Sequence, residues 1–152
     1  MFALARALQP EYKAIAASGV MLQVDCPDMA MGRHTRFSHL SDHEFTLIAQ
    51  TNVDALNVAL GDIDPAMVRV HVCWGNYPGP HHLDMDAATI WPQVSRMAAK
   101  YILIEGANPR HEHEWETFNP ACLHRNQVLV PGVIACHGAH VEHPQLVRRH
   151  SV

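Results

Sequence analysis

His71 and Cys73 stand two residues apart at the end of an apolar run that begins at Met67. A β-strand directs alternate side chains to the same face, so the imidazole and the thiol would point together. Both groups are zinc ligands, and a catalytic zinc commonly takes three protein ligands and leaves one position open. The spacing therefore indicates a Zn2+ site, with ordinary packing of a His and a Cys as the alternative.

Glu105 closes the run YILIE, which predicts the next strand. Neighbouring strands lie about 4.8 Å apart, so its carboxylate can reach the point that His71 and Cys73 face. A carboxylate at the end of an apolar strand needs a partner. We therefore expect His71, Cys73 and Glu105 to be the metal ligands.

Further candidates lie at other predicted strand ends. Gln23 and Asp25 share a face of the preceding strand, where Asp25 is either a ligand-binding group or a cap. Asn76 and Tyr77 follow Cys73 in a Gly- and Pro-rich loop that either lines a substrate pocket or is only a turn. Cys136 is either a spare ligand or a packed or partly exposed thiol.

The remaining histidines and cysteines carry less information. Most of the 13 histidines stand in loop-like sequence and are expected at the surface or behind a site. Arg110, His111 and His113 are expected on a solvated face. Cys26 and Cys122 are most simply buried small residues.

Apolar runs alternate with helical patterns along the chain. Ser41 with Glu44 has the spacing of a capping box, and Pro92 is expected to kink or split the third helix. Pro131 and Gly132 indicate a bulge or bend in the last strand. Helices are predicted over 3–18, 41–60, 83–100 and from 141, and strands over 20–27, 67–73, 101–107 and 127–135.

This alternation predicts an α/β fold with a parallel sheet. The strand spacing is close to the roughly 31 residues per unit of a 250-residue eight-unit barrel. We expect residues 1–152 to form a single incomplete domain of about four βα units, a partial (β/α)8 TIM barrel. A doubly wound open sheet is the alternative, although VDCPDMAMG lacks its Gly-rich phosphate turn.

Composition and charge exclude several classes of protein. The chain has 152 residues, is 48% hydrophobic and carries a formal charge of -4 without basic clusters, so nucleic acid is not an expected partner. No apolar window approaches the roughly 20 residues that span a bilayer, and no signal core is present. Four scattered cysteines do not suggest disulfides. A cytoplasmic location is expected.

Four ordered segments carry a family resemblance: QVDCPDMA, HVCWGNYPGPHH, IEGANPRHEHEWE and LVPGVIACHGAHVEHPQLV. Together they resemble the cobalamin-independent methionine synthase-like proteins, which include epoxyalkane:coenzyme M transferase relatives. The resemblance covers nearly the whole chain.

The resemblance implies a zinc-dependent barrel that binds a thiol, lowers its pKa and transfers an alkyl group to it. The thiol would be homocysteine with a methylated folate, for methionine biosynthesis, or coenzyme M with an epoxide. His71 and Cys73 would be zinc ligands, and Glu105 a third that is exchanged when the thiol binds. Asp25 would help to hold an amino group of the substrate, alongside Gln23, Asn76 and Tyr77 in the substrate site.

Departures from the family pattern leave two other functions open. The family usually has an acidic residue at Cys26, carries Asp where IACHGAH stands, and places its last zinc cysteine beyond the position where this chain ends. A second chain or an oligomer would then complete the barrel. The alternatives are a non-catalytic remnant that binds metal, with Cys136 as substitute ligand, and a metal-free decarboxylase on a related barrel.

Overall fold

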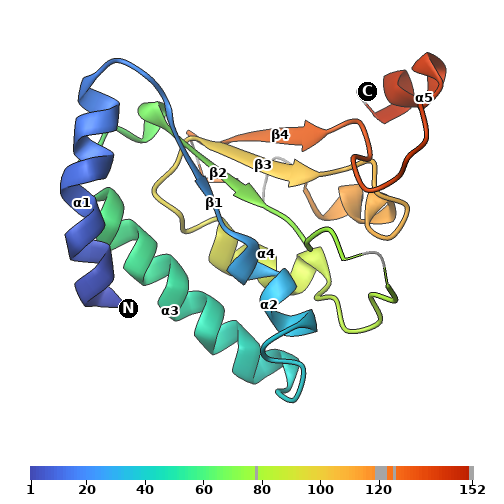
Figure 1. Cartoon of the computed structure of the whole chain (residues 1–152), viewed down its shortest axis with the longest axis horizontal. Coiled ribbons are helices and arrows are strands. Elements are labelled where there is room, and N and C mark those ends of the chain that lie inside the picture. The colour runs from blue at the N-terminus through green and yellow to red at the C-terminus, as the bar shows by residue number, and fades with distance from the viewer. Residues whose placement is uncertain (78, 119–122, 125, 151–152) are drawn as a thin grey trace.

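The computed structural model describes residues 1–77, 79–118, 123, 124 and 126–150. Its centre is a four-stranded sheet, in the order β1-β2-β3-β4, in which every neighbouring pair is parallel. The predicted α/β class is confirmed, and the sheet alternates with helices as in part of a βα repeat (Figure 1). The strands are β1 Leu22–Asp25, β2 Val68–Val72, β3 Tyr101–Glu105 and β4 Val128–Gly132.

Helices lie between the strands, before the first strand and after the last one. Short 3-10 turns follow β1 and precede β2, and a longer one follows β3. The α-helices are α1 Phe2–Ala17, α2 Met31–His34, α3 Asp42–Leu60, α4 Ala87–Val94 and α5 Pro144–His150, and the 3-10 helices are Pro27–Met29, Pro65–Met67 and Glu112–Thr117.

Helix α3 begins where the sequence predicts. The Ser41 hydroxyl accepts a hydrogen bond from the Glu44 amide, and the Glu44 carboxylate accepts one from the Ser41 amide, which completes the capping box. The helix ends at Gly61, whose φ of 58° lies in the region that favours glycine. Along its length, Phe45, Ala49 and Val53 are buried against the sheet.

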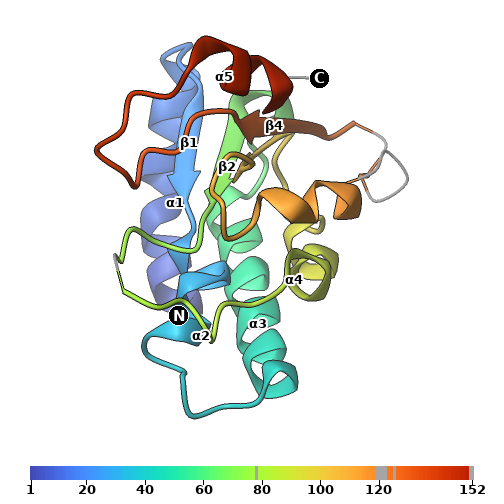
Figure 2. The ribbon, with the colours of Figure 1, turned by 90° about the vertical axis from the view of Figure 1, so that its right-hand side faces the viewer.

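One face of the sheet holds the core, because alternate side chains of each strand point to α3 and α4. In β2 these are Val68, Val70 and Val72, all fully buried. Figure 1 shows α3 and α4 on the same side of the strands, and Figure 2 shows α1 beside α3. This face also contains Leu22 from β1 and Ile102 and Ile104 from β3.

The other side chains point to the opposite face, where Asp25, His71 and Glu105 lie at the strand ends. The rest of that face we call the open face: Gln23, Arg69, Tyr101, Leu103, Val128 and Val130. Four of them stand in one row, because Gln23 pairs with Arg69, Arg69 with Tyr101, and Tyr101 with Val128. Val128 and Val130 are 41% and 38% exposed. Parallel sheets normally have both faces covered, so this exposure is unusual.

Two expectations about elements were wrong in detail. The third helix occupies only Ala87–Val94 rather than 83–100, and it ends two residues after Pro92. No bulge forms in β4, because Pro131 and Gly132 pair one to one with Ile104 and Glu105. The Val128 amide and the Gly132 carbonyl bond toward β3, so Pro131, which has no N–H, occupies an outward position at the sheet edge.

Within the described residues, no helix is long and apolar enough to cross a membrane. Cys26 is 5% exposed, as expected for a packed thiol. The expectation for Cys122 concerns a residue outside the described ranges.

Candidate metal centre

The carboxyl ends of β1 and β2 bring three possible ligands together. Asp25 ends β1, His71 pairs with it in β2, and Cys73 follows two residues later. One ligand atom from each of Asp25, His71 and Cys73 lies within 4.8 Å of the other two. Imidazole, thiolate and carboxylate are all zinc ligands, so the donor set fits that ion. These three residues form a candidate metal site.

Asp25 fixes the orientation of His71. The His71 Nδ1 and the Asp25 Oδ1 are 2.7 Å apart, which is a short, charge-assisted hydrogen bond. With Nδ1 donating to the carboxylate, Nε2 keeps its lone pair available for a cation. Metal-bound histidines commonly have such a carboxylate behind them. The sequence leads us to expect that Asp25 binds the substrate, but it does not predict the hydrogen bond between Asp25 and His71.

Glu105 is placed beside the three residues rather than among them. Its Oε1 accepts a hydrogen bond from the amide of Trp74, the residue after Cys73, at 3.2 Å. Its Oε2 accepts one from Asn108 at 2.9 Å and lies 3.8 Å from the Nδ1 of His137. The carboxylate therefore has the partners that sequence reasoning required of it, but it does not belong to the group within 4.8 Å.

Cys73 lies in a negative environment. Burial raises the pKa of its thiol above the ordinary value, and the nearby charges of Asp25, Glu105 and Cys136 raise it further, while a hydrogen bond from the backbone at Gly75 lowers it. A cation bound here would offset these charges. Cys26, by contrast, is held as a neutral thiol, because burial and then Asp28, Asp25 and Cys73 raise its pKa to about 12.

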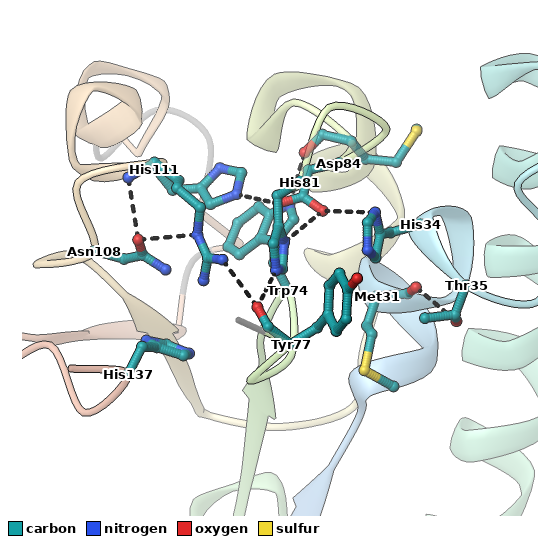
Figure 3. A network of polar contacts seen from close by, with 12 residues as sticks. Met31, His34, Thr35, Trp74, Tyr77, His81, Asp84, Asn108, His111 and His137 are labelled. Carbon is teal, nitrogen blue, oxygen red and sulfur yellow. Dashed lines mark hydrogen bonds and ion pairs between the residues drawn. The ribbon is translucent and has the colours of Figure 1, made fainter. Parts of the chain in front are cut away.

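A second polar group lies behind the loop that follows β2. We call it the histidine cluster: His34, His81, Asp84, His111 and Glu114. Figure 3 shows Asp84 between the rings of His81 and His111. Their nitrogens lie 2.8 Å from Asp84 Oδ2, and the other nitrogen of His111 lies 2.8 Å from Glu114.

Hydrogen bonding determines the charge of this cluster. Both ring nitrogens of His111 face carboxylates, so the ring donates from both and is an imidazolium. Burial by itself lowers the pKa of His111, but the hydrogen bonds to Asp84 and Glu114 outweigh it and raise that pKa to about 9. Burial raises the pKa of Asp84, but the hydrogen bonds from His111 and His81 outweigh it, and the net pKa is lowered.

The cluster supports the metal-site loop from behind. The indole of Trp74 stacks on the His111 ring with centroids 4.1 Å apart, and its Nε1 donates to the Met85 carbonyl at 2.7 Å. Glu114 accepts a hydrogen bond from the Ala87 amide and so fixes the start of α4. Cys73 is thus followed directly by a residue whose backbone and ring are both anchored.

The other predicted site residues lie around this centre. Gln23 is exposed on the open face two residues before Asp25, and Asn76 is exposed in the loop after β2. The Tyr77 ring packs at 5.4 Å from His34, and its carbonyl accepts a hydrogen bond from His81. Cys136 is exposed and does not belong to the group within 4.8 Å.

Sequence reasoning missed the histidine cluster. His111 was expected on a solvated face, yet it and Glu114 are buried, at 8% and 9% exposure. The signal that could have found them is the three-residue spacing of His111 and Glu114, since the pair shares one side of a helical turn. Asp84 has the same spacing with its partner His81, but its contact with His111, which is 27 residues away, gave no local signal.

Comparison of the chain with models of protein families, with curated proteins and with solved structures gives no match.

Proposed function

We propose that this chain binds Zn2+ at its candidate metal centre and activates a thiol substrate for alkyl transfer. The observation that carries the proposal is the convergence of Asp25, His71 and Cys73 within 4.8 Å at the carboxyl ends of two adjacent parallel strands. The resemblance of the sequence to the cobalamin-independent methionine synthase-like proteins supports the same chemistry. Methyl transfer to homocysteine is the specific reaction that we favour, with alkyl transfer from an epoxide to coenzyme M as the alternative.

Each residue has a defined part in this proposal. His71 and Cys73 would bind the ion, with Asp25 orienting His71 through its Nδ1 and offering its second oxygen. Glu105, held by Asn108 and the Trp74 amide, stands next to Cys73 as a ligand that can enter or leave. Zinc would supply a positive charge that lowers the pKa of a bound thiol.

The transfer itself is a nucleophilic substitution at carbon. The substrate thiol loses its proton to solvent, and the sulfur lone pair forms the new S–C bond. The bond from that carbon to nitrogen in a methylated folate, or to oxygen in an epoxide, breaks with its electron pair going to the leaving atom. A proton from solvent then neutralises the leaving atom.

Metal content tests the proposal. We expect the wild-type chain to bind about one zinc, measured by elemental analysis after gel filtration, and Cys73→Ala to lose most of it. Cys26→Ala is the matched control, because Cys26 is a buried neutral thiol outside the three-residue group. Equal zinc in wild type and Cys73→Ala would contradict the proposal.

A second candidate function is metal binding without catalysis. The exposure of Val128 and Val130 favours it, since a barrel enzyme encloses this face. Cys136→Ser tests whether the exposed thiol is the substitute ligand, because unchanged zinc content would exclude that role. Zinc binding without any alkylation of homocysteine or coenzyme M would then favour the non-catalytic function.

A further inference from the structure

Arg110 is held against the loop that follows Cys73 by neutral groups. Its Nε donates to the side-chain oxygen of Asn108 at 3.2 Å, and a terminal nitrogen donates to the Tyr77 carbonyl at 3.4 Å. Its own amide also donates to the Asn108 oxygen. These contacts fix the guanidinium in place without neutralising its charge.

The guanidinium has an unused donor. In the part of the chain that the structure describes, the second terminal nitrogen of Arg110 is buried and has no hydrogen-bond partner. No ion pair between described residues includes Arg110, although other arginines are paired: Arg33 with Asp42, and Arg96 with Asp54. Buried donors are almost always satisfied, so an acceptor from outside the chain is expected here.

A chain of hydrogen bonds joins this arginine to the metal centre. Asn108 accepts from Arg110 through its oxygen and donates through its nitrogen to Glu105. Glu105 in turn accepts from the amide of Trp74, next to Cys73. Figure 3 shows Asn108 facing the loop that carries Tyr77 and His81. Arg110 is thus two side chains away from Cys73.

We propose that Arg110 is an anion anchor that binds an oxyanion on the ligand of the metal centre. The ligand class is a small thiol that carries a carboxylate, sulfonate or phosphate group. A planar guanidinium suits such groups because it offers parallel N–H donors. The thiol part of this inference rests on the proposed function, whereas the anion part rests on Arg110 alone.

A matched pair of thiols tests the anchor in the cobalt(II)-loaded protein. We expect wild type to bind 3-mercaptopropionate about tenfold more tightly than the neutral 3-mercaptopropan-1-ol, as judged from the thiolate-to-cobalt absorption band. Arg110→Gln should reduce this ratio to about one and leave the affinity for the neutral thiol unchanged. Arg110→Lys should retain part of the preference, because it keeps the charge and loses the planar fork.

Arg96→Gln is the control, since Arg96 is paired with Asp54 away from the site and its loss should leave the ratio unchanged. A preference for the acid that persists in Arg110→Gln would overturn the anchor.

A metal-free measurement separates this inference from the proposed function. We expect the Nε–H resonance of Arg110 in 15N-labelled protein to shift on titration with propionate and with methanesulfonate. The size of the shift for each anion then shows which oxyanion the site prefers. An unmoved resonance with both anions would overturn the anchor, whether or not thiols bind cobalt. If no thiol binds cobalt in any variant and the resonance still shifts, the proposed function fails and the anchor stands.

Discussion

His111 and Asp84 form a buried hydrogen bond of 2.8 Å between two loops, and the two side chains are only 7% and 6% exposed. One loop follows β2, whose end carries His71 and Cys73, and the other follows β3, so the pair joins the metal-site loop to the loop of the neighbouring strand. Because His111 is an imidazolium between Asp84 and Glu114, the bond depends on the charge of all three groups.

Stability should therefore fall as the pH rises above neutrality. The pKa of His111 is raised from 6.5 to about 9, so its contribution is fully present below pH 6.5 and is lost as the pH approaches 9. A shift of that size corresponds to at most about 3 kcal/mol. We expect the free energy of unfolding in urea, measured from pH 6 to pH 9 in metal-free protein, to decline over this window. His111→Asn should flatten the profile, and parallel profiles would contradict the assignment.

Acid should weaken the same cluster for a different reason. The pKa of Asp84 is lowered in the folded protein. Its carboxylate therefore contributes to folding stability above the ordinary aspartate pKa, and this contribution is lost as the pH falls below that value. Asp84→Asn removes the carboxylate that His81 shares with the buried imidazolium of His111. We expect a loss of about 3 kcal/mol at pH 6, measured by urea unfolding.

His82→Asn is a suitable control for Asp84→Asn, because His82 is exposed and directly follows His81. Its stability should match wild type within about 0.5 kcal/mol. An equal loss in both variants would show that Asp84 has no special role.

The sequence was sufficient for the parts of the fold that local patterns determine. Short-range spacing is enough to predict the capping box at Ser41 and the alternation of β2 through His71. It also predicts the order of the strands along the chain. The convergence of His71 and Cys73 follows in the same way, since a strand alone places them on one face. The sequence places Asp25 at the end of a neighbouring strand, but it does not predict the contact between Asp25 and His71.

Long-range contacts could not be predicted in this way. The Asp84 carboxylate meets His111 only after two loops fold against each other, and nothing near Asp84 in the chain announces that partner. Arg110 appeared to belong to a solvated run, because its neutral partner Tyr77 lies 33 residues away. The end of α4 could not be predicted either. Pro92 disturbs the helix, but how many residues remain helical after a proline depends on packing.

Metal affinity should depend on the Asp25 carboxylate. Asp25→Asn preserves the shape of the side chain but removes the charge that holds His71 in its tautomer. We expect zinc affinity, measured by competition with a chromophoric chelator, to fall about 10- to 100-fold. Asp62→Asn removes a carboxylate that pairs with Lys13 at the surface and should not change it. Unchanged affinity in Asp25→Asn would exclude Asp25 from the site.

The open face and the β4 edge should make the chain self-associate. Val128 and Val130 are exposed on the strand at one end of the sheet, and an unpaired parallel edge offers free N–H and C=O groups to another chain. Val130→Lys places a charge in the middle of this strand, which disfavours edge pairing. We expect sedimentation velocity to show association of wild type that increases with concentration, and a shift toward monomer in Val130→Lys. Leu47→Lys is the control, because Leu47 is equally apolar and 52% exposed but lies on α3, away from the sheet edge. If Leu47→Lys had the same effect as Val130→Lys, association would depend on general surface hydrophobicity rather than on this edge.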